Sequence, residues 1–175
     1  CPRQIISCLD DLSDFHRLAF RLFDIDLSQI LIVHEPIQVH SLIVPSQASL
    51  FGPDRTTSTD YINFLSSLKF PLFTSPSRRQ DLKLYVSRSA LSASAGSIFC
   101  ERFIEYLFYL NGFRIIHPQN YTLYEQLSLY KIAHVLCFAE GSSLHTLELL
   151  GHIQASVLVL SRGGFFRKQL MSFAS

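Results

Sequence analysis

The sequence predicts an α/β fold in which a Rossmann-like, doubly wound parallel sheet occupies the second half of the chain. Short apolar runs alternate there with helical patterns of spacing three and four. Turn residues such as Asn111 and Gly112 separate one expected element from the next. Alternation of strand and helix favours right-handed parallel crossovers, which leave a sheet covered by helices on both faces.

The first part of the chain, residues 1–70, predicts a helix, two strands and a helix. An amphipathic stripe indicates the first helix at residues 13–23. Two strands are expected at residues 29–34 and 37–44, and a second helix at 59–68. Pro71, Pro76 and their polar neighbours then interrupt all periodicity, so residues 71–81 are expected to form a linker.

Residues 82–175 predict a domain of four strands and four helices in alternation. The strands are expected at residues 82–87, 113–117, 134–138 and 156–160, and the helices at 98–110, 122–132, 144–150 and from 164 onward. The helix at 98–110 carries its large apolar residues on one face, namely Phe99, Phe103, Leu107 and Leu110. Gly112 can end that helix in a left-handed conformation, and Thr122 with Glu125 has the spacing of a capping box.

Composition excludes several classes of function. The 15 Lys and Arg residues nearly balance the 14 Asp and Glu residues, which argues against nucleic-acid binding through bulk charge. The four cysteines lack the paired spacing of a zinc site, so no metal is expected and a reducing compartment fits. Apolar residues make up 48% of the chain and charged residues 17%, and we expect the surplus apolar surface to meet a partner.

The chain carries no pattern for membrane insertion or secretion. No apolar run approaches the ~20 residues that a membrane-spanning helix needs. No charged leader with an apolar core follows Cys1. Because the first residue is not Met, we expect the chain to be part of a longer protein.

Ligands of open parallel sheets bind outside the carboxyl ends of the strands. Arg88, which directly follows the strand expected at 82–87, is therefore the first candidate binding residue. The guanidinium of Arg88, next to Ser87, could form a forked contact with phosphate. An ion pair on the surface is the alternative.

The loop at residues 139–143 is the second candidate. Gly141 lets a ligand approach the backbone before the helix that follows, and Ser142 and Ser143 add hydroxyls that could bind a phosphate or a sugar. An ordinary N-cap at either serine is the alternative.

Other polar residues near the strand ends have simpler explanations beside the functional one. The possible sugar or nucleotide contacts, besides Ser87, are Glu101, Glu125, Gln126 and Glu140. The helix dipole alone favours Glu101 at a helix start, and the capping box explains Glu125. His145 could donate to a phosphate or could be a half-buried structural residue. No catalytic triad or metal cluster emerges.

The order of these segments resembles glycosyltransferase family 61, which includes capsular-polysaccharide biosynthesis enzymes of bacteria and protein or xylan glycosyltransferases of eukaryotes. The segments that carry the resemblance are residues 41–46, 83–88, 111–118, 125–127 and 133–145, with Glu101. Many members have His-Gly-Ala where this chain has Glu140-Gly141-Ser142, and Asn-Glu where it has Cys100-Glu101.

The resemblance implies an enzyme of the GT-B type, of which residues 1–70 would be the remnant or end of the N-terminal lobe and residues 82–175 the C-terminal, donor-binding lobe. It implies transfer of a sugar from a nucleotide-sugar, UDP-linked, to a polysaccharide, lipopolysaccharide or protein acceptor, with inversion and without a metal or other cofactor. Arg88 would neutralise the diphosphate together with Gly141, Ser142, Ser143 and His145. The general base would lie in the N-terminal lobe, where a His-Trp motif commonly precedes a Leu-Pro-Arg segment in the family. This chain contains no Trp, so that motif is absent.

The resemblance also implies a setting and partners. A cytoplasmic protein at the inner face of a bacterial membrane is expected, with peripheral association, a glycan or glycolipid acceptor, and a further N-terminal lobe or partner chain. Two alternatives stay open: a non-catalytic nucleotide-sugar or phosphate-binding module that works through a partner, and a bare α/β interaction domain.

Overall fold

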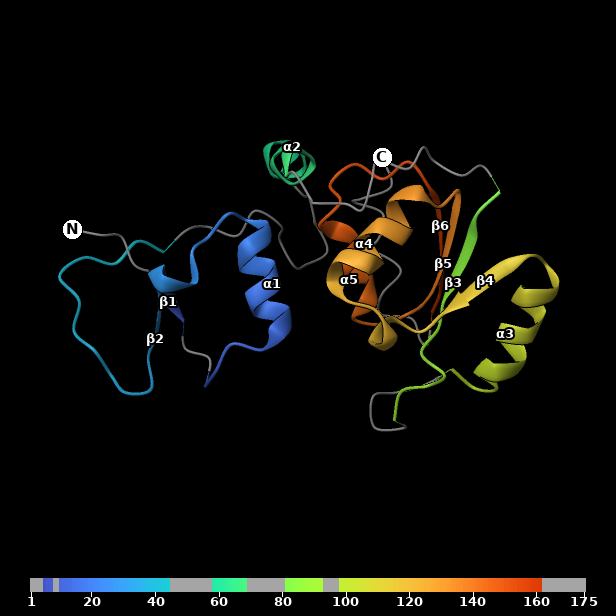
Figure 1. Cartoon of the computed structure of the whole chain (residues 1–175), viewed down its shortest axis with the longest axis horizontal. Coiled ribbons are helices and arrows are strands. Elements are labelled where there is room, and N and C mark those ends of the chain that lie inside the picture. The colour runs from blue at the N-terminus through green and yellow to red at the C-terminus, as the bar shows by residue number, and fades with distance from the viewer. Residues whose placement is uncertain (1–4, 8–9, 45–57, 69–80, 93–97, 162–175) are drawn as a thin grey trace. The chain divides into compact units, whose positions relative to one another are not determined.

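The computed structural model describes residues 5–7, 10–44, 58–68, 81–92 and 98–161. The chain divides into two compact units (Figure 1). The first unit comprises residues 1–47 and 68–70, and the second unit comprises residues 48–67 and 71–175. Most of the expected linker at 71–81 and the expected helix from 164 lie outside the described residues.

The first unit contains a small β–α–β arrangement. Strands β1 (Ile5–Ser7) and β2 (Ile30–Ile32) pair in parallel, with Ile5 opposite Ile30. Helix α1 (Asp14–Leu22) and the 3-10 turn η1 (Leu27–Gln29) connect them. The helix expected at 13–23 is confirmed, and the strand expected at 29–34 forms over its central part.

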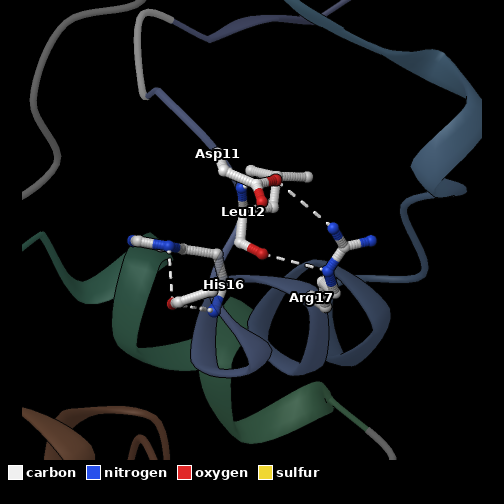
Figure 2. Close-up of polar contacts among 5 residues, drawn as sticks. Asp11, Leu12, His16 and Arg17 are labelled. Carbon is white, nitrogen blue, oxygen red and sulfur yellow. Dashed lines mark hydrogen bonds and ion pairs between the residues drawn. The ribbon is translucent and has the colours of Figure 1, made fainter.

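Polar contacts fix the start of α1 (Figure 2). Ser13 is its N-cap, and the Ser13 hydroxyl accepts a hydrogen bond from the backbone N–H of His16. Arg17 turns back across the first turn, donating from Nε to the Leu12 carbonyl at 3.0 Å and pairing with Asp11 at 3.4 Å. The cap that the sequence pattern requires is therefore made by local side chains.

The strand expected at residues 37–44 is absent: these residues are exposed and irregular. Ile37, Val39 and Ile43 give the alternation that predicts a strand, but side-chain alternation does not provide hydrogen-bonding neighbours. The expectation was wrong because β2 pairs with β1, a strand that the sequence pattern did not indicate.

The second unit is built on a four-stranded parallel sheet in the order β4-β3-β5-β6. Its strands are β3 (Lys83–Val86), β4 (Phe113–Ile116), β5 (Val135–Ala139) and β6 (Ser156–Leu160). The helices between them are α3 (Glu101–Leu110), α4 (Leu123–Ile132) and α5 (Ser143–Glu148), with the 3-10 turn η3 (Pro118–Asn120) before α4. The mixed α/β fold with a parallel sheet is thus as the sequence predicted.

The two faces of this sheet bury different side chains. Leu84 and Val86 point to the face covered by α4 and α5, where Tyr130, Phe138 and Leu147 complete a core. Figure 1 shows these two helices on one side of the sheet and α3 on the other. The alternation of inward and outward residues along β3 therefore fills both layers.

The α3 side of the sheet has a smaller core around Tyr85 and Cys137. Phe108 of α3 stacks on Tyr85 with ring centroids 4.4 Å apart and meets Phe113 edge-on at 4.8 Å. Cys137 is a buried free thiol whose pKa is raised to about 12 by burial. A buried thiol of this kind contributes to packing.

The apolar stripe expected at residues 98–110 faces away from the sheet. Phe99, just before α3, is 90% exposed, and Phe103, Leu107 and Leu110 of α3 are exposed as well. The inward face is instead occupied by Ile104, Phe108 and two glutamates. The stripe that the sequence placed on one face is real, but it forms the outer surface of the second unit.

Helix α2 (Thr59–Ser67) belongs to the second unit, although the sequence division placed it in residues 1–70. Leu65 is fully buried, and the Ser66 hydroxyl accepts a hydrogen bond from the backbone N–H of His152 at 3.0 Å. Gly151 allows this approach, since a Cβ there would lie 2.6 Å from the backbone nitrogen of Ser66. Among the described residues, no helix has the length and apolarity to cross a bilayer.

Candidate functional site

The candidate site lies at the carboxyl ends of β3 and β5, which are neighbours in the sheet. The chain leaves β3 toward β4 on one side and later returns to add β5 on the other. Strand order therefore reverses between β3 and β5, and open α/β sheets bind ligands at such a point. Ser87 and Arg88 directly follow β3, and Glu140 and Gly141 directly follow β5.

Arg88 and Gly141 are in contact across this edge. Arg88 is only 7% exposed, which excludes the surface position considered for it from the sequence. A Cβ built on Gly141 would overlap the guanidinium and lie 2.6 Å from Arg88 Cζ. Glycine at position 141 is therefore what lets the Arg88 side chain lie against the backbone of the β5 loop.

The carboxylate of Glu101, in the first turn of α3, reaches across to the end of β3. Its Oε1 atom accepts hydrogen bonds from the Arg88 backbone N–H at 2.8 Å and from the hydroxyls of Ser87 at 3.0 Å and Tyr85 at 3.2 Å. Glu101 is 4% exposed. Its Oε2 atom is buried and has no hydrogen-bond partner among the described residues.

Tyr85 belongs to this polar cluster as well as to the core. Burial, reinforced by the nearby charge of Glu101, raises the pKa of the Tyr85 phenol far above its ordinary value. The neutral phenol is therefore the form that donates to Glu101.

The family comparison adds to this geometry. The family model described as Glycosyltransferase 61 matches residues 10–151. That match covers most of the chain and includes β3, α3, β5 and the whole candidate site. The chain belongs to glycosyltransferase family 61. No curated protein matches it, and no solved structure does.

In this family 61 chain the β5 loop does not make the caps that the sequence left open as an alternative. Ser142 occupies the N-cap position of α5, but its side chain makes no capping hydrogen bond. The Oγ atom of Ser143 is buried and has no partner among the described residues. Glu140 is buried and its Oε2 accepts a hydrogen bond from the Ser161 hydroxyl at 2.8 Å, so it ties β5 to the end of β6.

Three other predicted residues are engaged locally. Glu125 completes the capping box of α4, and its Oε2 accepts from the backbone N–H of Thr122 at 2.7 Å, which lowers the Glu125 pKa. The Gln126 amide donates to the carbonyls of Pro118 and Tyr121 and so holds η3 against α4. His145 is exposed, and its Nδ1 lies 3.0 Å from Glu148.

Sequence reasoning missed a second polar cluster beside the site. The Ser89 hydroxyl donates to Glu105 Oε1 at 2.6 Å, and His117 Nε2 lies 3.8 Å from the same oxygen. His117 Nδ1 is buried without a partner among the described residues. The available signal was spacing: Glu105 lies one turn after Glu101, and His117 follows β4, the neighbour of β3.

Within the described ranges, no three His, Cys, Asp or Glu side chains come together in a way that could hold a metal ion. The polar groups of the site instead gather around one guanidinium and one carboxylate. The guanidinium is that of Arg88, which directly follows β3. The carboxylate is that of Glu101 on α3, which accepts a hydrogen bond from the Arg88 backbone.

Proposed function

We propose that this family 61 glycosyltransferase transfers a sugar from a UDP-linked donor to a polysaccharide, lipopolysaccharide or protein acceptor. The observation that carries the proposal is the contact between the Arg88 guanidinium and Gly141, where strand order reverses. Arginine binds phosphate through paired N–H groups, and the missing side chain at Gly141 lets this arginine lie against the β5 loop. A phosphate-binding side chain is therefore held at the edge of the sheet where ligands of such folds bind.

The proposed reaction places charge on the diphosphate. The bond between the anomeric carbon and the β-phosphate oxygen breaks as the acceptor oxygen attacks from the opposite face, so the product is inverted. Negative charge grows on the leaving UDP, and Arg88 stabilises that charge more in the transition state than in the ground state. Ser142 and Ser143, whose hydroxyls make no cap, are the further donors in this proposal.

The remaining features of the proposal follow the family resemblance. They are a GT-B arrangement, a reaction without a metal ion, and a cytoplasmic location at the inner face of a bacterial membrane. The acceptor hydroxyl must lose its proton to a general base. None of the residues at this edge takes that role, which belongs to an N-terminal lobe or partner chain.

Thermal unfolding with a panel of nucleotide-sugars tests donor binding. A ligand at 100 times its Kd stabilises the folded state by about 2.7 kcal/mol, which raises Tm by several degrees for a chain of this size. We expect UDP-sugars to raise Tm and Arg88→Ala to abolish the rise. Arg102→Ala is the matched control, because it removes the same charge from an exposed position on α3.

The outcomes distinguish an enzyme from a non-catalytic binding module and from a chain that binds no donor. If no UDP-, GDP- or CMP-linked sugar shifts the Tm of the folded wild-type chain, donor binding is wrong. If donors bind but no glycan or glycolipid acceptor releases UDP, the non-catalytic binding module replaces the enzyme. Release of UDP that depends on both the acceptor and Arg88 supports transfer.

A further inference from the structure

The buried carboxylate of Glu101 needs an explanation beyond the helix dipole. A carboxylate near the start of a helix is favoured electrostatically even when it is exposed to solvent, so the dipole does not account for burial. Burying a charged group costs free energy unless hydrogen bonds compensate. Here three donors converge on Oε1 while Oε2 has no partner among the described residues.

The local backbone also departs from an ordinary helix start. Cys100, at the N-cap of α3, has a φ of 53°, in the left-handed region that costs free energy for a non-glycine residue. Its side chain makes no capping hydrogen bond. The start of α3 therefore has no side-chain cap and a strained backbone at Cys100. In this conformation the adjoining Glu101 side chain contacts the end of β3.

We propose that Glu101 is a positioning residue for Arg88, an inference that rests on the proposed function of Arg88 as the diphosphate-binding group. Glu101 holds the Arg88 backbone N–H directly and the preceding Ser87 through its hydroxyl. These two bonds fix the main chain from which the guanidinium extends to Gly141. Glu101 acts on the donor through Arg88 and makes no contact with the donor itself.

The geometry explains why such a residue matters. An arginine side chain has many rotamers, and fixing its backbone lowers the entropy that is lost when the guanidinium binds phosphate. Displacement of a positioned group by about 1 Å can reduce its effect by one to two orders of magnitude. The loss of Glu101 should therefore be seen in diphosphate binding and not in recognition of the nucleoside.

UDP and uridine are the probes, because they differ only by the diphosphate. Calorimetric titration of the full chain compares the wild type with Arg88→Ala, Glu101→Ala and the double variant. We expect Glu101→Ala to weaken UDP about tenfold and to change uridine less than about twofold. In the Arg88→Ala background it should have no further effect on UDP, since its action passes through Arg88.

Conservative variants keep the test informative if Glu101→Ala does not fold. Glu101→Gln retains an oxygen acceptor and should bind UDP within about threefold of the wild type. Glu101→Asp keeps the charge but shortens the reach, and should behave like Glu101→Ala. If Glu101 had only a structural role, these variants would have a lower Tm, and their affinities for UDP and uridine would change equally. Equal weakening of both probes, or additivity in the double variant, would overturn the inference.

A ligand-free measurement separates this inference from the proposed function. If the wild type binds neither probe, donor binding by this chain is wrong, but the positioning of Arg88 can still be measured by amide hydrogen exchange. Glu101→Ala should speed exchange at the Arg88 N–H at least tenfold, while Glu125→Ala should leave it unchanged. Unchanged protection of the Arg88 amide in Glu101→Ala would overturn the positioning role.

Discussion

Glu101 and Glu125 occupy equivalent places in the sequence pattern and have opposite surroundings in the fold. Each lies in the first turn of a helix that follows a strand of the same sheet. Glu125 is exposed and bonds only to Thr122 of its own cap. Glu101 is buried and bonds to three residues of β3 and its end. Helix position predicts a carboxylate in both cases, whereas tertiary contacts decide what the carboxylate does.

Replacing the two glutamates by alanine should give the largest difference. Glu101→Ala leaves three buried donors without their acceptor, each costing about 1 kcal/mol or more, so we expect a loss of about 3 kcal/mol in the free energy of unfolding. Glu125→Ala removes two hydrogen bonds to Thr122, both exposed to solvent, and should cost several times less. Urea unfolding of both variants measures the ratio, and equal losses would contradict the distinction.

The glycines near these two regions should separate binding from stability. Gly141→Ala forces the end of the flexible Arg88 side chain to move, so UDP binding should weaken about tenfold with little change in Tm. Gly112→Ala meets no atom within 4 Å but requires a residue at φ 79°, so it should cost about 1 kcal/mol and leave binding intact. Calorimetric titration and thermal unfolding of both variants check this crossed pattern.

Tyr85→Phe tests one branch of the Glu101 cluster. The variant keeps the stacking on Phe108 and removes only the hydroxyl that donates to Glu101. We expect a loss of about 1 kcal/mol, measured by urea unfolding. UDP affinity should stay within about twofold of the wild type, because the bond from the Arg88 backbone remains. A larger change in affinity would mean that Tyr85 also positions Arg88.

The smallest effect on stability is expected at His145, whose contact with Glu148 lies within one helix, as the contact of Glu125 lies within its own cap. The hydrogen bond to Glu148 raises the pKa of His145 above its usual 6.5. Its contribution to stability is therefore complete below the unfolded pKa of about 6.5 and is lost as pH rises through the higher folded value. NMR titration should show a lower His145 pKa in Glu148→Gln, and an unchanged value would contradict the contact.

Much of the second unit could be predicted because its signals are local. Apolar runs indicated β3 to β6, and Gly112 and the Thr122 capping box indicated helix ends. The strand expected at 37–44 failed because pairing depends on a neighbour that no local pattern specifies. The outward face of α3 was equally hidden, since periodicity defines a stripe and not the layer it faces.

The candidate site was predictable in part for the same reason. Arg88 and Gly141 were found because strand ends and turns are visible in the sequence. Their mutual contact, and the reach of Glu101 to Tyr85, join residues from different elements of the fold. Ser89 and His117 were missed because each becomes relevant only when β3 and β4 lie side by side.

The central place of β3 has a consequence for synthesis. Lys83 pairs with Val135. The edge of β3 that pairs with β5 therefore stays unpaired until about fifty further residues have left the ribosome. At translation rates of about 5–20 residues per second, that interval lasts several seconds. During it Leu84 and Val86 lack the β5 side of their core. During that interval strand β3 offers a ribosome-associated chaperone an apolar segment that the finished fold buries completely.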